Sequence, residues 1–126
     1  DKYDLVIVPG FQFGGMEHPG AVLYNDKRMF LGPHPTIEEE LGRMELIAHE
    51  TTHMWFGDAV TMAWFDDVWT KEVFANYFAS QMTRPEFPGV NHLLNDLRNF
   101  YIPAYADKTT FGKLKGCRFD LRTDCL

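Results

Sequence analysis

Cysteine is scarce in this sequence, which argues against a cysteine-based metal site. The chain contains only Cys117 and Cys125, both near its C-terminal end. A structural zinc site would need two more ligands at suitable spacing, and these are absent. The pair therefore favours free thiols over a local disulfide, and we assign it no function.

Long hydrophobic runs are also missing. No apolar stretch approaches the roughly eighteen residues expected of a transmembrane helix, and the chain starts with neither an initiator methionine nor a signal peptide. The sequence thus predicts no membrane segment in this chain. Since an internal start says nothing about the compartment of a parent protein, the localisation stays open.

Positive charge is in short supply. Asp and Glu number 18 against 12 Lys and Arg, which gives a net charge of −6. Nucleic-acid binding requires a basic face, so we predict no nucleic-acid partner. Acidic residues near a cleft would favour cationic groups such as a free amino terminus, although a solvated surface accounts for most charges of this kind.

The residues that are present predict a globular α+β chain. Hydrophobic residues make up 45% of the chain and aromatic residues 15%, enough for one core. Apolar, β-branched segments predict strands at residues 3–9 and 21–24, with an edge segment at 11–15. Helices are predicted at residues 36–56, from Asp66 or Asp67 to about Met82, and at 90–101. One face of the last helix is apolar, with Leu93, Leu94, Leu97, Phe100 and Tyr101.

The first predicted helix has a defined start and stop. Thr36 and Glu39 form an S/T-x-x-E capping box, and Gly57 is placed to end the helix. Apolar residues recur at helical spacing and would bury one side of it: Ile37, Leu41, Met44, Ile47 and Ala48.

Within this helix, the segment His49-Glu50-Thr51-Thr52-His53 has the spacing of a zinc site. Side chains at i and i+4 lie about 40° apart around a helix, so both imidazoles can reach one ion. Glu50 projects about 100° from His49, which suits it to hold a water rather than the ion. Glu72, on the next predicted helix, would be a third ligand and leave a fourth position open, as in catalytic sites. The alternative is an ordinary helix with polar surface residues, which the helix signals around the motif disfavour.

A group of aromatic residues lies between the two ligand-bearing segments. We expect these rings to form core packing that fixes the second helix, because aromatic side chains dominate core area. A role in recognising substrate side chains is the alternative. The group consists of Trp55, Phe56, Trp64, Phe65 and Trp69.

Three segments in this order resemble the aminopeptidase N family of gluzincin metallopeptidases. Gly14-Gly15-Met16-Glu17-His18 is similar to the family's Gly-Ala-Met-Glu-Asn exopeptidase motif. Residues 48–60 are similar to its zinc helix running into Trp-Phe-Gly-Asn, and residues 69–75 to Trp-Leu-Asn-Glu-Gly-Phe-Ala. His18, Lys71 and Val73 depart from these motifs, but every metal ligand is retained.

The resemblance implies part of a thermolysin-like gluzincin catalytic domain, with edge strands of a mixed sheet followed by zinc-binding helices. Residues 1–35 would form the sheet edge, 36–82 the zinc-binding helices, and 83–126 the start of a helical lobe and an irregular end. One zinc ion and peptide substrates with a free N-terminus are implied, with Glu50 as general base. The family's oxyanion-stabilising tyrosine should lie beyond Leu126. We therefore interpret the chain as a fragment that binds zinc but cleaves poorly on its own.

Glu17 is the residue that would distinguish an exopeptidase from other zinc proteases. By itself, a glycine pair followed by a glutamate usually marks a turn with an exposed carboxylate. In the family's order, residues 14–18 would instead bind substrate. Glu17 would hold the substrate ammonium through a charge-assisted hydrogen bond, and Gly14 and Gly15 would let the peptide backbone approach.

Two other functions stay open. The pair Gly14-Gly15 also resembles the leukotriene hydrolase branch, which hydrolyses an epoxide and keeps aminopeptidase activity. Some relatives serve as non-catalytic scaffolds after losing their ligands, and the intact set in this chain argues against that role. We expect the other histidines, His18, His34 and His92, to be surface or structural residues rather than metal ligands.

Overall fold

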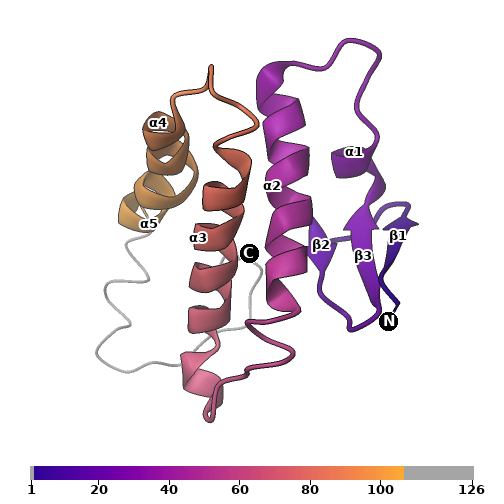
Figure 1. The fold of residues 1–126 in the computed structure, drawn as a ribbon, viewed down its shortest axis with the longest axis vertical. Coiled ribbons are helices and arrows are strands. Elements are labelled where there is room, and N and C mark those ends of the chain that lie inside the picture. Colours follow the sequence, from indigo (N-terminus) through magenta and orange to yellow (C-terminus); the bar gives the residue numbers. More distant parts are fainter. Residues whose placement is uncertain (1, 107–126) are drawn as a thin grey trace.

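The computed structural model describes residues 2–106, which form a small sheet followed by a series of helices (Figure 1). The strands are β1 (Asp4–Val8), β2 (Gly15–Met16) and β3 (Ala21–Asn25). The helical elements are α1 (Asp26–Met29), α2 (Ile37–His53), the 3-10 turn η1 (Phe65–Asp67), α3 (Trp69–Thr83), α4 (His92–Asp96), the π-helical turn η2 (Leu97–Tyr101) and α5 (Ile102–Ala106). This order confirms the mixed α+β architecture predicted from the sequence. None of the helices within this range is long and apolar enough to cross a bilayer.

Some predictions cannot be compared with the structure. Cys117, Cys125 and the irregular end expected within residues 83–126 lie wholly or partly outside the described residues.

The sheet places the exopeptidase-like segment beside the first long helix. The central strand β3 pairs in parallel with β1 on one side and antiparallel with β2 on the other. Val22 and Tyr24 on β3 are fully buried and alternate with partly buried neighbours, as expected of a strand. The short edge strand β2 contacts α2. Glu17 follows β2 directly and is therefore held next to α2.

Helix α2 begins as the capping box predicts. The Glu39 amide donates to Thr36 Oγ1 at 3.2 Å, and the Thr36 amide donates to Glu39 Oε2 at 2.7 Å. Leu41 and Ala48 are buried, whereas Ile37 in the first turn is exposed, so the buried stripe starts later than expected.

The predicted end of this helix at residue 56 is slightly wrong. Its last turn tightens after His53, because the Met54 and Trp55 amides donate to the carbonyls of Thr51 and Thr52 three residues back. Gly57 then reverses the chain with a φ of 138°.

The second long helix starts differently from the prediction. Asp66 and Asp67 do not cap it but lie in η1, and α3 begins at Trp69 with no side-chain cap. The amides of Asp67 and Val68 donate to the carbonyls of Trp64 and Phe65, so one helical turn leads directly into the next.

The prediction of an aromatic core between the two helices is wrong for most of the group. The residues of α3 that are buried are small: Ala75, Ala79, Ser80 and Thr83. Small side chains let α2 and α3 pack closely, which leaves the bulky rings outside the contact. Only Phe56 packs as expected, with ring centroids 4.9 Å from Phe74 and 5.3 Å from Phe78. The other four rings are at least half exposed: Trp55, Trp64, Phe65 and Trp69.

The third predicted helix starts two residues later than expected and continues past residue 101 through η2 and α5. Figure 1 shows α2 between the sheet and α3, with α4 and α5 beyond α3. Asp96 of α4 pairs with Arg84, directly after the end of α3, at 2.9 Å, and Asn95 donates to Glu45 of α2 at 3.0 Å. The apolar residues predicted for one face of this helix are all exposed, from Phe100 at 37% to Leu93 at 77%.

The capping box gives a first test. Replacing Thr36 by Ala removes the side-chain acceptor for the Glu39 amide, so the free energy of unfolding should fall by about 1 kcal/mol. Urea unfolding followed by circular dichroism measures this change. Thr61→Ala, at an exposed threonine outside the helices, is the matched control. An equal effect of the two substitutions would contradict the assignment.

Candidate metal centre

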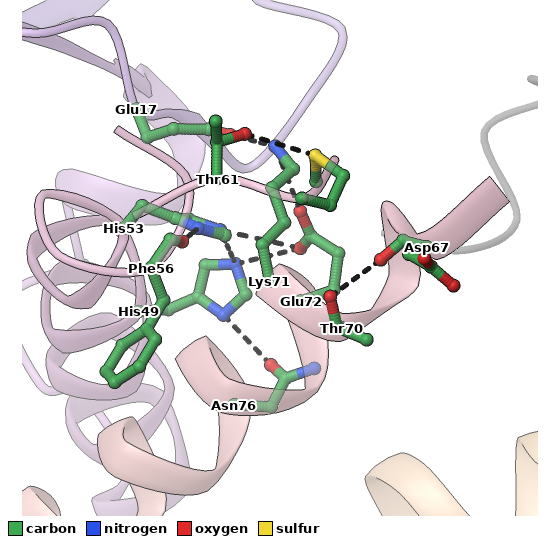
Figure 2. A network of polar contacts seen from close by, with 11 residues as sticks. Glu17, His49, His53, Phe56, Thr61, Asp67, Thr70, Lys71, Glu72 and Asn76 are labelled. Carbon is green, nitrogen blue, oxygen red and sulfur yellow. Dashed lines mark hydrogen bonds and ion pairs between the residues drawn. The ribbon is translucent and has the colours of Figure 1, made fainter. Parts of the chain in front are cut away.

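Three electronegative atoms from two helices meet at one point (Figure 2). The Nε2 atoms of His49 and His53 on α2 are 3.0 Å apart. Oε2 of Glu72 on α3 lies 3.3 Å from the first and 3.5 Å from the second. The structure thus brings together the three residues that the sequence predicts as ligands. The His53 side chain is 1% exposed and that of Glu72 is 15% exposed, so little water reaches the point where they meet.

The outer nitrogens of both imidazoles are held by oxygen acceptors. His49 Nδ1 lies 2.9 Å from Asn76 Oδ1, and His53 Nδ1 lies 2.9 Å from the carbonyl oxygen of Phe56. Because a carbonyl oxygen can only accept, each Nδ1 carries the proton, and each Nε2 of a neutral ring presents its lone pair to the centre. Asn76 is a candidate site residue that the sequence analysis missed. Its position one turn after Glu72 on α3 is the signal that could have identified it.

The close approach of these lone pairs is stable only with a positive charge between them. Two imidazole lone pairs and a carboxylate oxygen repel one another at these distances unless a positive charge lies between them. Burial acts to lower the pKa of His53, but the contacts with Glu72 and the Phe56 carbonyl raise it above its ordinary value. Burial acts to raise the pKa of Glu72, yet contacts with the two imidazoles hold it well below its usual range. A metal ion bound by these three atoms would supply that positive charge.

Glu50 lies beside the histidine pair. One of its carboxylate oxygens is within 4.8 Å of a ring nitrogen of His49 and of a ring nitrogen of His53, and the residue is only 4% exposed. Burial raises the pKa of Glu50 to about 7; His49 opposes the shift, and Glu17 adds to it. A carboxyl with this pKa can both take up and release a proton near neutral pH.

The edge strand β2 supplies the space that Glu50 occupies. A Cβ atom built on Gly15 would lie 2.7 Å from Glu50 Cγ, closer than such atoms approach. The absence of a side chain at Gly15 thus seats the Glu50 carboxyl against the strand. At Gly14, a Cβ would lie 3.3 Å from Leu46 Cδ1, so both glycines serve packing against α2.

Glu17 lies on the same side of the site as Glu72, whereas its neighbour His18 is exposed. Its side chain is 15% exposed, which differs from the exposed carboxylate expected of a simple turn. Burial acts to raise the pKa of Glu17, but an ion pair with Lys71 lowers it below the ordinary value. Met16 on β2 is paired with Leu23 on β3.

Asp58 is a second residue near the site that the sequence analysis did not identify. It follows Gly57 in the turn after α2, and its amide donates to the His53 carbonyl at 3.1 Å. Its buried Oδ2 has no hydrogen-bond partner among the described residues. Burial and the nearby Glu17 raise the pKa of this carboxyl.

An α+β fold with a helix-borne histidine pair facing a glutamate defines a candidate metallohydrolase. Residues 1–110 match the Peptidase family M1 domain, and the chain belongs to this family. The match confirms the resemblance drawn from the three motifs.

The chain is similar to several aminopeptidases. It is 39% identical over 99 residues to the puromycin-sensitive aminopeptidase of Caenorhabditis elegans, covering 75% of this chain and 10% of that protein. It is 38% identical over 98 residues to the human endoplasmic reticulum aminopeptidase 2, covering 75% and 10%. With the mouse aminopeptidase Q the identity is 37% over 90 residues, covering 71% and 16%. The chain therefore spans only a small part of the length of these relatives.

The raised pKa of Glu50 gives a test of stability against pH. A carboxyl whose pKa is raised by folding destabilises the folded state once the unfolded chain would ionise it. This contribution should be negligible below about pH 4.5 and complete above about pH 7. In the metal-free protein, Glu50→Gln should raise the free energy of unfolding at pH 8 by up to roughly 3 kcal/mol, and change it little at pH 4.

Urea unfolding at the two pH values measures the difference. Glu38→Gln, at an exposed glutamate in the first turn of the same helix, controls for the loss of one negative charge. A benefit of Glu50→Gln that is the same at pH 4 and pH 8 would show that ionisation of Glu50 is not its source.

Proposed function

We propose that the protein containing this chain is a zinc-dependent aminopeptidase that removes N-terminal residues from peptides. In this proposal His49, His53 and Glu72 hold the zinc ion, Glu50 is the general base, and Glu17 holds the substrate amine. The observation that carries it is the meeting of the three ligand atoms within 3.0–3.5 Å beside a buried carboxyl.

The donor set fits zinc. Tetrahedral zinc with ligands at about 2.0–2.1 Å places those ligands about 3.3 Å from one another. The distances between the three atoms lie on both sides of this value. The outer hydrogen bonds that the two imidazoles donate to Asn76 and to the Phe56 carbonyl orient the rings as metal-bound histidines require. When bound, zinc would polarise the scissile carbonyl and acidify a water molecule.

Glu50 supplies the proton transfers. Its carboxylate accepts the proton of the attacking water and returns it to the leaving amine. A pKa of about 7 makes both transfers feasible at neutral pH, and the burial that raises it also excludes bulk water from the reacting groups.

Glu17 supplies the selection for chain ends. Its carboxylate lies close to His53 and Glu72, so an ammonium bound to it would lie within one residue of the reacting carbonyl. The aminopeptidase names of the relatives support this assignment. We further infer that the described residues belong to a thermolysin-like catalytic domain. Its parts are the sheet edge, the zinc-binding helices and the start of a helical lobe. Residues 1–126 alone should bind zinc but cleave poorly, because the oxyanion-stabilising tyrosine is expected beyond Leu126.

The retained set of four residues argues against the scaffold alternative. A non-catalytic relative has no need to keep a buried carboxyl beside two facing imidazoles, since this arrangement costs stability.

Metal binding gives the first test of the proposal. The full-length protein should bind one zinc ion, and Asn76→Ala should weaken the binding about 10–100-fold because it releases the His49 ring. Glu72→Gln removes a ligand and should weaken it further. Competition with a chromogenic chelator measures both affinities. Asn99→Ala, at an exposed asparagine on η2, is the matched control. Unchanged zinc affinity in Glu72→Gln would refute the ligand assignment.

Measurement of turnover together with zinc content distinguishes the proposed general base from the proposed zinc ligands. Glu50→Gln should lower kcat on an aminoacyl amide by about 10²–10⁴ while zinc stays bound at full stoichiometry. Metal analysis and steady-state kinetics of the same preparation measure the two quantities. Loss of zinc together with activity would assign Glu50 to the ligand set instead.

A further inference from the structure

A lysine already occupies the carboxylate that is expected to bind the substrate amine. The Lys71 ammonium forms an ion pair with Oε1 of Glu17 and lies 3.3 Å from Oε1 of Glu72 (Figure 2). Glu72 uses its other oxygen toward the histidines. Lys71 thus joins the amine-binding carboxylate to the proposed metal ligand. The motif that residues 69–75 resemble has an uncharged asparagine at this position.

Lys71 is built into the site rather than lying on the surface. Its side chain is 23% exposed, and its Cδ passes 3.4 Å from where a Cβ on Gly57 would stand. The lysine stem therefore packs against the turn that follows α2. Lys71 also lines a largely apolar cavity of about 120 Å³ together with Phe56, Met62 and Phe74.

The ion pair changes the electrostatic balance at Glu17 in two ways. A peptide whose N-terminus is acylated brings no cation, so on closing the site it would leave a lone carboxylate buried and unpaired, at a cost. Lys71 removes that cost by remaining on Glu17. A peptide with a free ammonium must share the carboxylate with Lys71, and the repulsion between the two cations reduces its gain. Both effects reduce the difference in binding free energy between peptides with a free N-terminus and peptides with a blocked one.

We propose that Lys71 is a specificity-determining residue that makes the amine site tolerant of peptides with a blocked N-terminus. This inference rests on the proposed function, because it takes Glu17 as the amine-binding group. It assigns to the site a second substrate class, N-acylated peptides, alongside peptides with a free amine.

The test compares two reporters on the zinc-loaded full-length protein, leucyl p-nitroanilide and N-acetyl-leucyl p-nitroanilide. The readout is the ratio of kcat/KM for the free over the acetylated reporter. Lys71→Met keeps the stem and removes the charge, and Lys71→Asn introduces the residue of the related motif. Both should raise the ratio about tenfold or more, whereas Lys71→Arg should keep it near the wild-type value.

Two controls isolate the mechanism. Lys27→Met, at an exposed lysine on α1, removes a positive charge away from the site and should leave the ratio unchanged. In a Glu17→Gln background, Lys71→Met should no longer change the ratio, because the carboxylate on which both cations compete is gone. A merely structural role of Lys71 would lower turnover on both reporters alike.

A ratio within twofold of wild type in both Lys71→Met and Lys71→Asn, or a fall in the ratio, overturns the inference. If turnover is too low to measure, binding of leucinamide and N-acetyl-leucinamide to the same zinc-loaded variants is measured by calorimetry. The ratio of the two affinities then replaces the ratio of kcat/KM as the criterion. Cleavage of neither reporter by the wild type would instead count against the proposed function, and calorimetry would still decide the role of Lys71. Failure of both amides to bind the wild type would overturn the inference, since it requires an amine site.

Discussion

The close contact between α2 and α3 is the constraint on which the site depends. The α3 residues that are buried are small, so the two helix backbones can approach each other and Glu72 can reach the histidine pair. The contact brings the carboxylate oxygen of Glu72 on α3 to within 3.5 Å of the two imidazole nitrogens that α2 already places side by side. Packing energy spread over the two helices holds this local repulsion in place, and a bound cation would relieve it.

The same arrangement gives chemically identical groups different properties. Glu50 and Glu72 are both carboxyls beside the histidines, yet burial raises the pKa of Glu50 to about 7, while contacts with the imidazoles hold that of Glu72 far lower. Environments that drive two carboxyls apart in this way are typical of acid and base assignments in active sites. Glu17 is set apart from both by its lysine partner.

The edge strand has a larger part in the site than its two paired residues indicate. The absence of a side chain at Gly15 creates the space for the Glu50 carboxyl, and the end of β2 directs Glu17 toward Lys71. The sheet and the helices therefore contribute to the same charged centre. A substitution on β2 should accordingly affect residues on α2.

Patterns that depend on near neighbours could be predicted from the sequence. The capping box at Thr36, the facing pair His49 and His53, and the strand containing Val22 and Tyr24 all follow from helix or strand periodicity over a few residues. The proposed third ligand Glu72 could be predicted because its motif accompanies the histidine pair. Only the tertiary structure decided the rest: Lys71 meets Glu17 across 54 positions, and Asn76 meets His49 across 27. It also decided which aromatic rings are buried, because that depends on how closely α2 and α3 pack, and no local pattern encodes that distance.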